Sequence, residues 1–148
     1  MLKEKKYGKK EINKMISPKN WEIWDAPKSE TVMYQYFPEF TCLCPRSGYP
    51  DFAKVHIVSI PSKKVLELKS LKLWLNSFRE KGISHENTTN FIADTLMDEL
   101  KLKYIFVLME YSPRGNLDTF PMTERGNIQY RNKEEIKQMK RNLIDKIM

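Results

Sequence analysis

A cysteine and an aspartate seven residues apart, Cys44 and Asp51, are the first pair in this sequence that could do chemistry. They bracket the loop CPRSGYPD, in which two prolines and a glycine favour a tight turn. A loop that folds back would place a nucleophile beside a proton donor, and the charge of Arg46 would favour the thiolate. The alternative is that Cys44 is a small buried hydrophobic residue, which is how Cys42 is interpreted.

The pair His85-Glu86 directly follows Ser84, which is a suitable N-cap for a helix. A helix start favours an ionised carboxylate, whose two oxygens could accept the paired N–H donors of a guanine-like ring edge. The alternative for Glu86 is a helix-start residue with no ligand, and His85 is either a proton relay or a surface histidine. Glu67 likewise has two interpretations: its carboxylate could bind a ligand, or it could form a salt bridge with Lys69 or Lys64.

Basic side chains offer a place for a phosphate. Lys69 and Lys72 lie three residues apart near a predicted helix start, and Arg114 lies in the turn SPRG. All three could equally be solvent-exposed residues of a charged face or a turn. The five glycines form neither a G-x-G-x-x-G motif nor a P-loop, so a dinucleotide would depend on these basic residues.

A zinc site is the other interpretation of two cysteines and two histidines. Cys42, Cys44, His56 and His85 are four potential ligands, but their spacing matches no usual zinc motif. We therefore predict no metal site.

Composition limits the class of protein. The 148 residues suffice for one domain, and 41% hydrophobic with 30% charged residues indicate a soluble globular chain. No apolar stretch is long enough for a membrane span or a signal peptide, and the two cysteines are too close for an ordinary disulfide, so we expect a cytoplasmic protein. The net charge of +7 suggests an anionic partner, and much of it lies between residues 63 and 81.

The predicted elements follow an order of two strands, two helices, two strands and a helix. Residues 1–30 are interpreted as a Lys-rich arm that packs by Trp21 and Trp24, and residues 31–148 as one domain. Strands are expected at 31–42, with Pro38 at a bulge or sheet edge, and at 53–60, 104–111 and, more weakly, 117–121. Helical spacing of apolar residues predicts helices near 71–78, 85–100 and 136–147. This order indicates an α+β fold with an antiparallel sheet.

Two segments carry a resemblance to a known family. EFTCLCPRSGYPDFA, from Glu39 to Ala53, and ELKSLKLW, from Glu67 to Trp74, are similar to the short, single-domain NADPH-dependent 7-cyano-7-deazaguanine reductases, the nitrile reductases of tRNA queuosine biosynthesis. SFREKGISHE and SPRGN extend the likeness to about Asp118. Tyr49 departs from the family, which often has glutamine there, so a side-chain role at that position is in doubt.

The resemblance implies roles for individual residues. Cys44 would add to the nitrile carbon to form a covalent thioimide, and Asp51 would protonate the nitrogen, with His85 beside them. Two NADPH molecules would then reduce the thioimide and the resulting imine to an aminomethyl group. The remaining implied residues are, for the substrate, Leu66, Glu67, Leu68, His85 and Glu86, and, for the phosphates of NADPH, Lys69, Lys72 and Arg114.

The resemblance also implies an architecture. The family has the tunnelling fold, or T-fold, in which sheets of several subunits join into a barrel with active sites at subunit boundaries. A homo-oligomer, a decamer of two stacked pentamers, is therefore expected, with no membrane and no direct nucleic-acid binding. Two other functions stay open: a zinc-dependent GTP cyclohydrolase-like enzyme of the same fold, and a basic RNA-binding protein suggested by the net charge.

Overall fold

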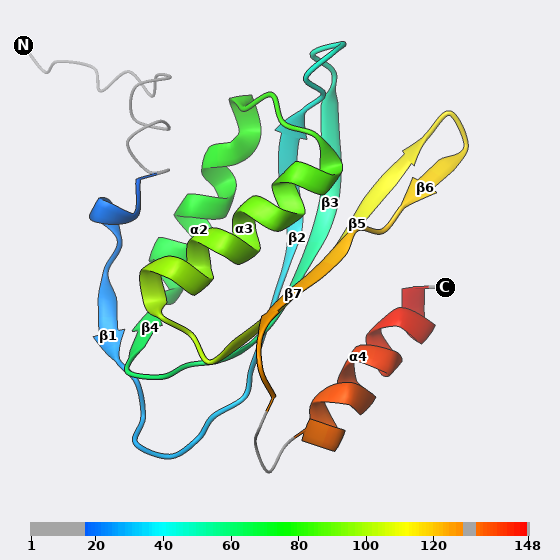
Figure 1. Cartoon of the computed structure of the whole chain (residues 1–148). Helices are drawn as coiled ribbons and strands as arrows, with labels where there is room; N and C mark the ends of the chain where they lie inside the picture. The colour runs from blue at the N-terminus through cyan, green and yellow to red at the C-terminus, as the bar shows by residue number, and fades with distance from the viewer. Residues whose placement is uncertain (1–16, 129–132, 148) are drawn as a thin grey trace, which may run out of the picture.

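The computed structural model describes residues 17–128 and 133–147 as an antiparallel sheet with helices on both faces (Figure 1). The sheet order is β2-β3-β5-β6, with β7 also paired to β5, and β1 and β4 form a separate two-stranded sheet. The elements are η1 Pro18–Asn20, β1 Ile23–Asp25, β2 Met33–Leu43, β3 Pro50–Ile60, β4 Lys64–Leu66, α2 Leu68–Asn76, η2 Ser77–Glu80, α3 His85–Leu100, β5 Tyr104–Arg114, β6 Leu117–Thr119, β7 Met122–Gly126 and α4 Lys133–Ile147.

The hairpin of β2 and β3 is formed as predicted from the alternation of apolar residues. Its register pairs Cys42 with Asp51 at the loop end, and a shift between Phe37 and Phe40 marks the bulge expected at Pro38. β2 lies at the edge of the sheet. A proline, which has no N–H to donate, is tolerated there because one side of an edge strand has no partner strand. The hairpin therefore presents its loop at one end of the sheet.

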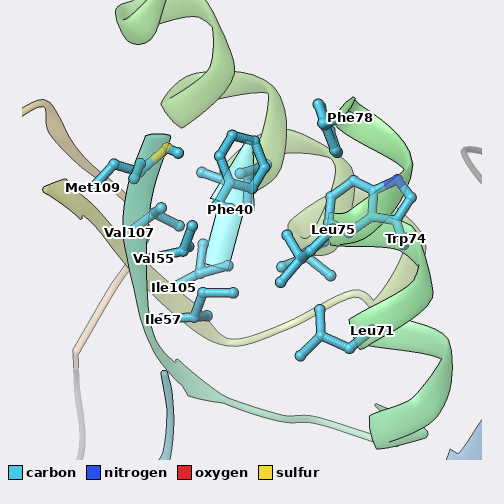
Figure 2. Packing of buried hydrophobic residues seen from close by; sticks show 14 of the residues in the cluster. Phe40, Val55, Ile57, Leu71, Trp74, Leu75, Phe78, Ile105, Val107 and Met109 are labelled. Carbon is cyan, nitrogen blue, oxygen red and sulfur yellow. The ribbon is translucent and has the colours of Figure 1, made fainter. Parts of the chain in front are cut away.

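Helices α2 and α3 cover one face of the sheet. Figure 2 shows Trp74 and Leu75 of α2 facing side chains of the central strands. The apolar residues of α2 recur three and four positions apart, so one side of the helix is buried. The shared core includes, among others, Phe40, Val55, Ile57, Leu71, Trp74, Leu75, Phe78, Ile92, Leu96, Ile105 and Val107.

Helix α4 packs on the opposite face of the sheet, as the C-terminal periodicity predicts. Ile136 and Leu143 are buried against residues of β3 and β5. Lys140 Nζ also donates a hydrogen bond to Glu124 on β7, at 2.6 Å. The sheet is thus covered on one face by α2 and α3 and, in part, on the other by α4.

A short connection brings the start of α3 to the end of the sheet that carries the β2–β3 loop. Leu43 donates its N–H to the carbonyl of Lys81, and Ile83 donates its N–H to the carbonyl of Leu43. Ser84 then caps α3, accepting from the Asn87 N–H at 3.2 Å as its sequence position predicts. These bonds place His85 beside the β2–β3 loop.

Some elements differ from the predictions. Trp21 joins the core, with its ring 5.1 Å from that of Trp74, but the expectation that Trp24 also packs is wrong, since its side chain is 56% exposed on β1. The sequence does not predict β1, β4 or β7, because each is short and carries at most one buried residue. Residues 1–16 of the Lys-rich arm lie outside the described residues.

Candidate functional site

Cys44 lies directly after β2, in a loop closed by its own backbone. Its N–H donates to the carbonyl of Tyr49 at 2.8 Å, and its carbonyl accepts from the N–H of Gly48 at 2.9 Å. Gly48 has φ +75°, a conformation that glycine adopts without steric cost. The loop folds back as the proline and glycine spacing predicts, and Tyr49 contributes to this closure through its backbone.

The loop stabilises the thiolate form of Cys44. A hydrogen bond from the Ser47 hydroxyl lowers the pKa of the Cys44 thiol below its ordinary value, and the backbone N–H groups of Ser47 and Arg46 add to this effect. Desolvation and, after it, the negative charge of Asp51 act in the opposite direction. The register of the hairpin pairs Asp51 with Cys42, two residues before Cys44. Arg46 contributes through its backbone N–H, and the effect expected of its side-chain charge stays a prediction.

Cys42 is a packing residue, as the sequence indicates. Its side chain is fully buried in the core, and its sulfur lies 3.9 Å from the hydroxyl of Tyr111. Burial raises the pKa of the Cys42 thiol. A neutral thiol in this position is a poor nucleophile.

Asp51 is buried at the start of β3 and has a partner at each carboxylate oxygen. Its Oδ1 accepts from Nε of Arg114 at 2.7 Å, and its Oδ2 lies 3.3 Å from Nε2 of His85. Its side chain is only 5% exposed. A buried carboxylate needs such partners, since burial of an unpaired charge is costly.

His85 is held flat against Tyr111 of β5. The two ring centroids are 3.6 Å apart and the planes differ by 6°. Burial raises the pKa of the Tyr111 hydroxyl, so this residue stays neutral. Tyr111 is a residue that sequence reasoning missed, since its distance from His85 along the chain hides the contact.

Glu67 lies at the N-cap of α2. Its carboxylate accepts from the N–H groups of Lys69 at 2.8 Å and Ser70 at 2.9 Å, and these bonds, led by that of Lys69, lower its pKa. The alternative of a salt bridge between Glu67 and Lys64 is wrong, because Lys64 pairs with Asp25 on β1. Glu86 lies in the first turn of α3, exposed and adjacent to His85.

The sequence-predicted residues fall into two groups at opposite ends of the helix layer (Figure 1). One group surrounds the β2–β3 loop: Cys44, Asp51, His85, Glu86 and Arg114. The other lies where β4 leads into α2: Leu66, Glu67, Leu68, Lys69 and Lys72. α2 starts within the second group, and η2 and residues 81–83 lead from its far end to the first group. Within one copy, the two groups therefore lie toward different ends of α2.

The four residues weighed as zinc ligands do not converge. His56 lies between the Tyr34 hydroxyl, 2.6 Å from its Nδ1, and Glu110 Oε2, 2.5 Å from its Nε2. Within residues 17–128 and 133–147, no three His, Cys, Asp or Glu side chains are placed to hold a metal ion.

Comparison with known proteins places this chain in a family. The family described as QueF-like protein matches residues 50–137. Among curated proteins, the NADPH-dependent 7-cyano-7-deazaguanine reductase of Aquifex aeolicus is 53% identical over 119 residues, covering 79% of this chain and 89% of that protein. The proteins of the same name from Nitratiruptor sp. and Sulfurimonas denitrificans are 50% and 45% identical, each over 77% of this chain and over 88% and 92% of their own.

A solved structure supports the fold. The crystal structure of the archaeosine synthase QueF-Like in the apo form matches with a TM-score of 0.63 and 22% identity. The match covers 68% of this chain and 99% of that one. Among the described residues, no helix is both long and apolar enough to cross a bilayer.

Proposed function

The chain belongs to the QueF-like family, and we propose that it catalyses the NADPH-dependent reduction of the nitrile of 7-cyano-7-deazaguanine to an aminomethyl group. The observation that carries the mechanism is the loop in which Cys44 has a lowered pKa beside the buried carboxylate of Asp51. A nitrile is a poor hydride acceptor, and a nucleophile with an adjacent proton carrier converts it into a better one.

The first step is addition of the Cys44 sulfur to the nitrile carbon. A C–S bond forms, the C≡N bond becomes C=N, and the nitrogen gains one proton to give a thioimide. Asp51 accepts the thiol proton of Cys44 and delivers it to this nitrogen, so no proton is gained or lost overall. The low pKa of Cys44 and the proximity of Asp51 support these roles.

His85 supports the proton transfer from the other side of Asp51. Its Nε2 lies 3.3 Å from Asp51 Oδ2, and Tyr111 restrains the plane of its ring. Histidine can hold or release a proton near neutral pH. Hydride addition to the C=N bond requires one further proton on the nitrogen, and we assign to His85 the supply of this proton through Asp51.

NADPH supplies hydride for the two reductions when it is bound. Lys69 and Lys72 are exposed in the first turns of α2, and Arg114 carries a guanidinium at the end of β5. Ammonium and guanidinium groups suit the phosphates of a dinucleotide in a chain with no P-loop. We propose these three residues as its binding groups, with the two lysines from one copy and Arg114 from another.

Substrate recognition requires both ends of the helix layer. Glu67 and Glu86, with His85 and the backbone of Leu66 and Leu68, are proposed to bind the deazaguanine ring through paired hydrogen bonds. Glu67 precedes α2, whereas the chain approaches the loop of Cys44 only after the end of this helix, through η2 and residues 81–83. We therefore propose that each pocket combines Cys44 of one copy with Glu67 of another.

We propose that the copies form a T-fold barrel, in a homo-oligomer of two stacked pentamers. The strand-strand-helix-helix-strand order and the edge position of β2 support it, since an unpaired edge strand can pair with another copy. We propose that this assembly works in the cytoplasm, where the free thiols of Cys42 and Cys44 stay reduced.

The proposed function is tested by incubating the protein with the nitrile substrate without NADPH and recording its intact mass. We expect a covalent adduct of the full substrate mass on the wild type and on Cys42→Ala, and none on Cys44→Ala. Added NADPH should be oxidised by the first two proteins only. Equal loss in both cysteine variants would contradict the assignment of the nucleophile, and no adduct on the wild type would contradict the proposed function.

A further inference from the structure

The guanidinium of Arg114 is turned toward the catalytic loop. Its Nε donates to Asp51 Oδ1 and its Nη2 donates to the carbonyl of Pro50, each at 2.7 Å. The tight turn after β5, in which Gly115 and Asn116 have φ of +56° and +66°, fixes the backbone from which Arg114 extends. Arg114 therefore binds two successive residues at the start of β3.

Arg114 differs in this respect from the two lysines proposed for the same phosphates. Lys69 and Lys72 are exposed on α2, and the described residues include no ion pair of either side chain. Arg114 is 40% exposed but its Nε contacts a carboxylate that is 5% exposed. A residue that served only to bind phosphate would have no need of this contact.

Asp51 has one partner for each oxygen. Arg114 occupies Oδ1, while His85 lies beside Oδ2. Two fixed partners at the two oxygens set the plane of the carboxylate, and this plane decides which atoms can exchange a proton with it. The planar, charged guanidinium is suited to such orientation, since its N–H groups point in fixed directions.

We propose that Arg114 is a positioning residue for Asp51 in the addition of Cys44 to the nitrile, in addition to any contact with the phosphates of NADPH. This inference rests on the proposed function. Loss of Arg114 leaves Asp51 buried with one partner fewer and free to rotate, so the proton transfer from sulfur to nitrogen slows. A guanidinium has five N–H donors, so the contact with Asp51 leaves donors for a phosphate.

The test measures the rate of adduct formation in the absence of NADPH, by quenching and intact mass. We expect Arg114→Gln to form the thioimide about tenfold or more slowly than the wild type, because a small misorientation of a catalytic group has effects of this size. In the Asp51→Asn background the same substitution should have no further effect, since the two residues act as one unit. The matched control is Arg125→Gln, which removes a different Arg–Asp pair, that of β7 with Asp94 on α3.

The outcomes separate the possible roles. A wild-type rate of adduct formation in Arg114→Gln, with only the KM for NADPH raised, would overturn the proposal and leave Arg114 as a phosphate ligand. Additive effects in the double variant would overturn it as well. If Arg114→Gln does not fold, Arg114→Lys is measured instead, since it keeps the charge but loses the two-pronged contact, and a wild-type rate there overturns the proposal. Absence of the adduct in the wild type would instead reject the proposed function.

Discussion

Cys42 and Cys44 are one residue apart but lie in environments that act on their thiols in opposite directions. Burial among core residues raises the pKa of Cys42, whereas the Ser47 hydroxyl and nearby backbone N–H groups lower that of Cys44. The strand ends at Leu43, between them, so the chain leaves the core at this point. Reactivity is therefore set by the end of β2 rather than by the residue type.

At this scale we predict that Ser47→Ala makes Cys44 less acidic. In the wild type, the pH at which Cys44 is half ionised should lie below the ordinary thiol value, because Ser47 stabilises the thiolate. Removing the hydroxyl should move this midpoint to higher pH. The measurement is the rate of alkylation of Cys44 by iodoacetamide as a function of pH, with the modified peptide identified by mass.

Cys42 is the internal control in the same samples. Its alkylation should stay slow across the pH range in both proteins, since its sulfur is buried. An unchanged midpoint for Cys44 in Ser47→Ala would show that the hydroxyl does not stabilise the thiolate.

The sequence allows prediction of the loop but not of all its partners. Two prolines and a glycine within eight residues indicate a loop that returns Asp51 toward Cys44, and the structure has this turn. The contacts of Asp51 with Arg114 and of His85 with Tyr111 could not be predicted. They join residues far apart in the chain and depend on the register of β3 with β5 and on the path of residues 81–83.

At the scale of elements, the N-cap of α2, Glu67, also belongs to the proposed substrate site. Both carboxylate oxygens of Glu67 accept N–H groups of the first turn. We predict that Glu67→Ala lowers the free energy of unfolding, because two N–H groups in the first turn of α2 lose their acceptor. Urea denaturation, followed by the circular dichroism of the helices, measures this change.

A matched variant separates stability from recognition. Glu67→Asp should keep the cap, since aspartate is a favoured N-cap residue, but its shorter side chain should weaken substrate binding. An unfolding free energy of Glu67→Ala equal to that of the wild type would contradict the structural part of this prediction.

The main elements follow from periodicity, and the small ones do not. The hairpin, α2, α3, β5 and α4 each have enough apolar residues at regular spacing to be predicted. The sequence does not predict β7, because its residues Met122–Gly126 include two charged side chains. Its stability as a strand comes from pairing with β5, which is earlier in the chain. Trp24 was expected in the core, yet the pairing of β1 with β4 leaves it exposed.

At the scale of the whole molecule, the separation of Cys44 from Glu67 makes a prediction about mixed assemblies. Cys44→Ala and Glu67→Gln should each be inactive alone, but together they should recover activity if each pocket takes one residue from each of two copies. Random mixing in equal amounts predicts about a quarter of the wild-type activity, because one pocket in four receives both intact residues.

The measurement is NADPH oxidation after the two variants are unfolded together and refolded, or after co-expression. The control mixes Cys44→Ala with Asp51→Asn, whose residues lie in the same loop, so no pocket can be made whole. No recovery in the first mixture would contradict the shared pocket.

The hydrophobic core, by contrast, is built from one chain, since Trp21, the central strands and the helices all pack within a single copy. In the proposed arrangement, a substitution of Glu67 leaves the Cys44 loop of the same copy intact. It inactivates instead the pocket that this Glu67 shares with Cys44 of a neighbouring copy. In a cell that makes both normal and damaged copies, the damaged copies would therefore also inactivate pockets that contain Cys44 of normal copies.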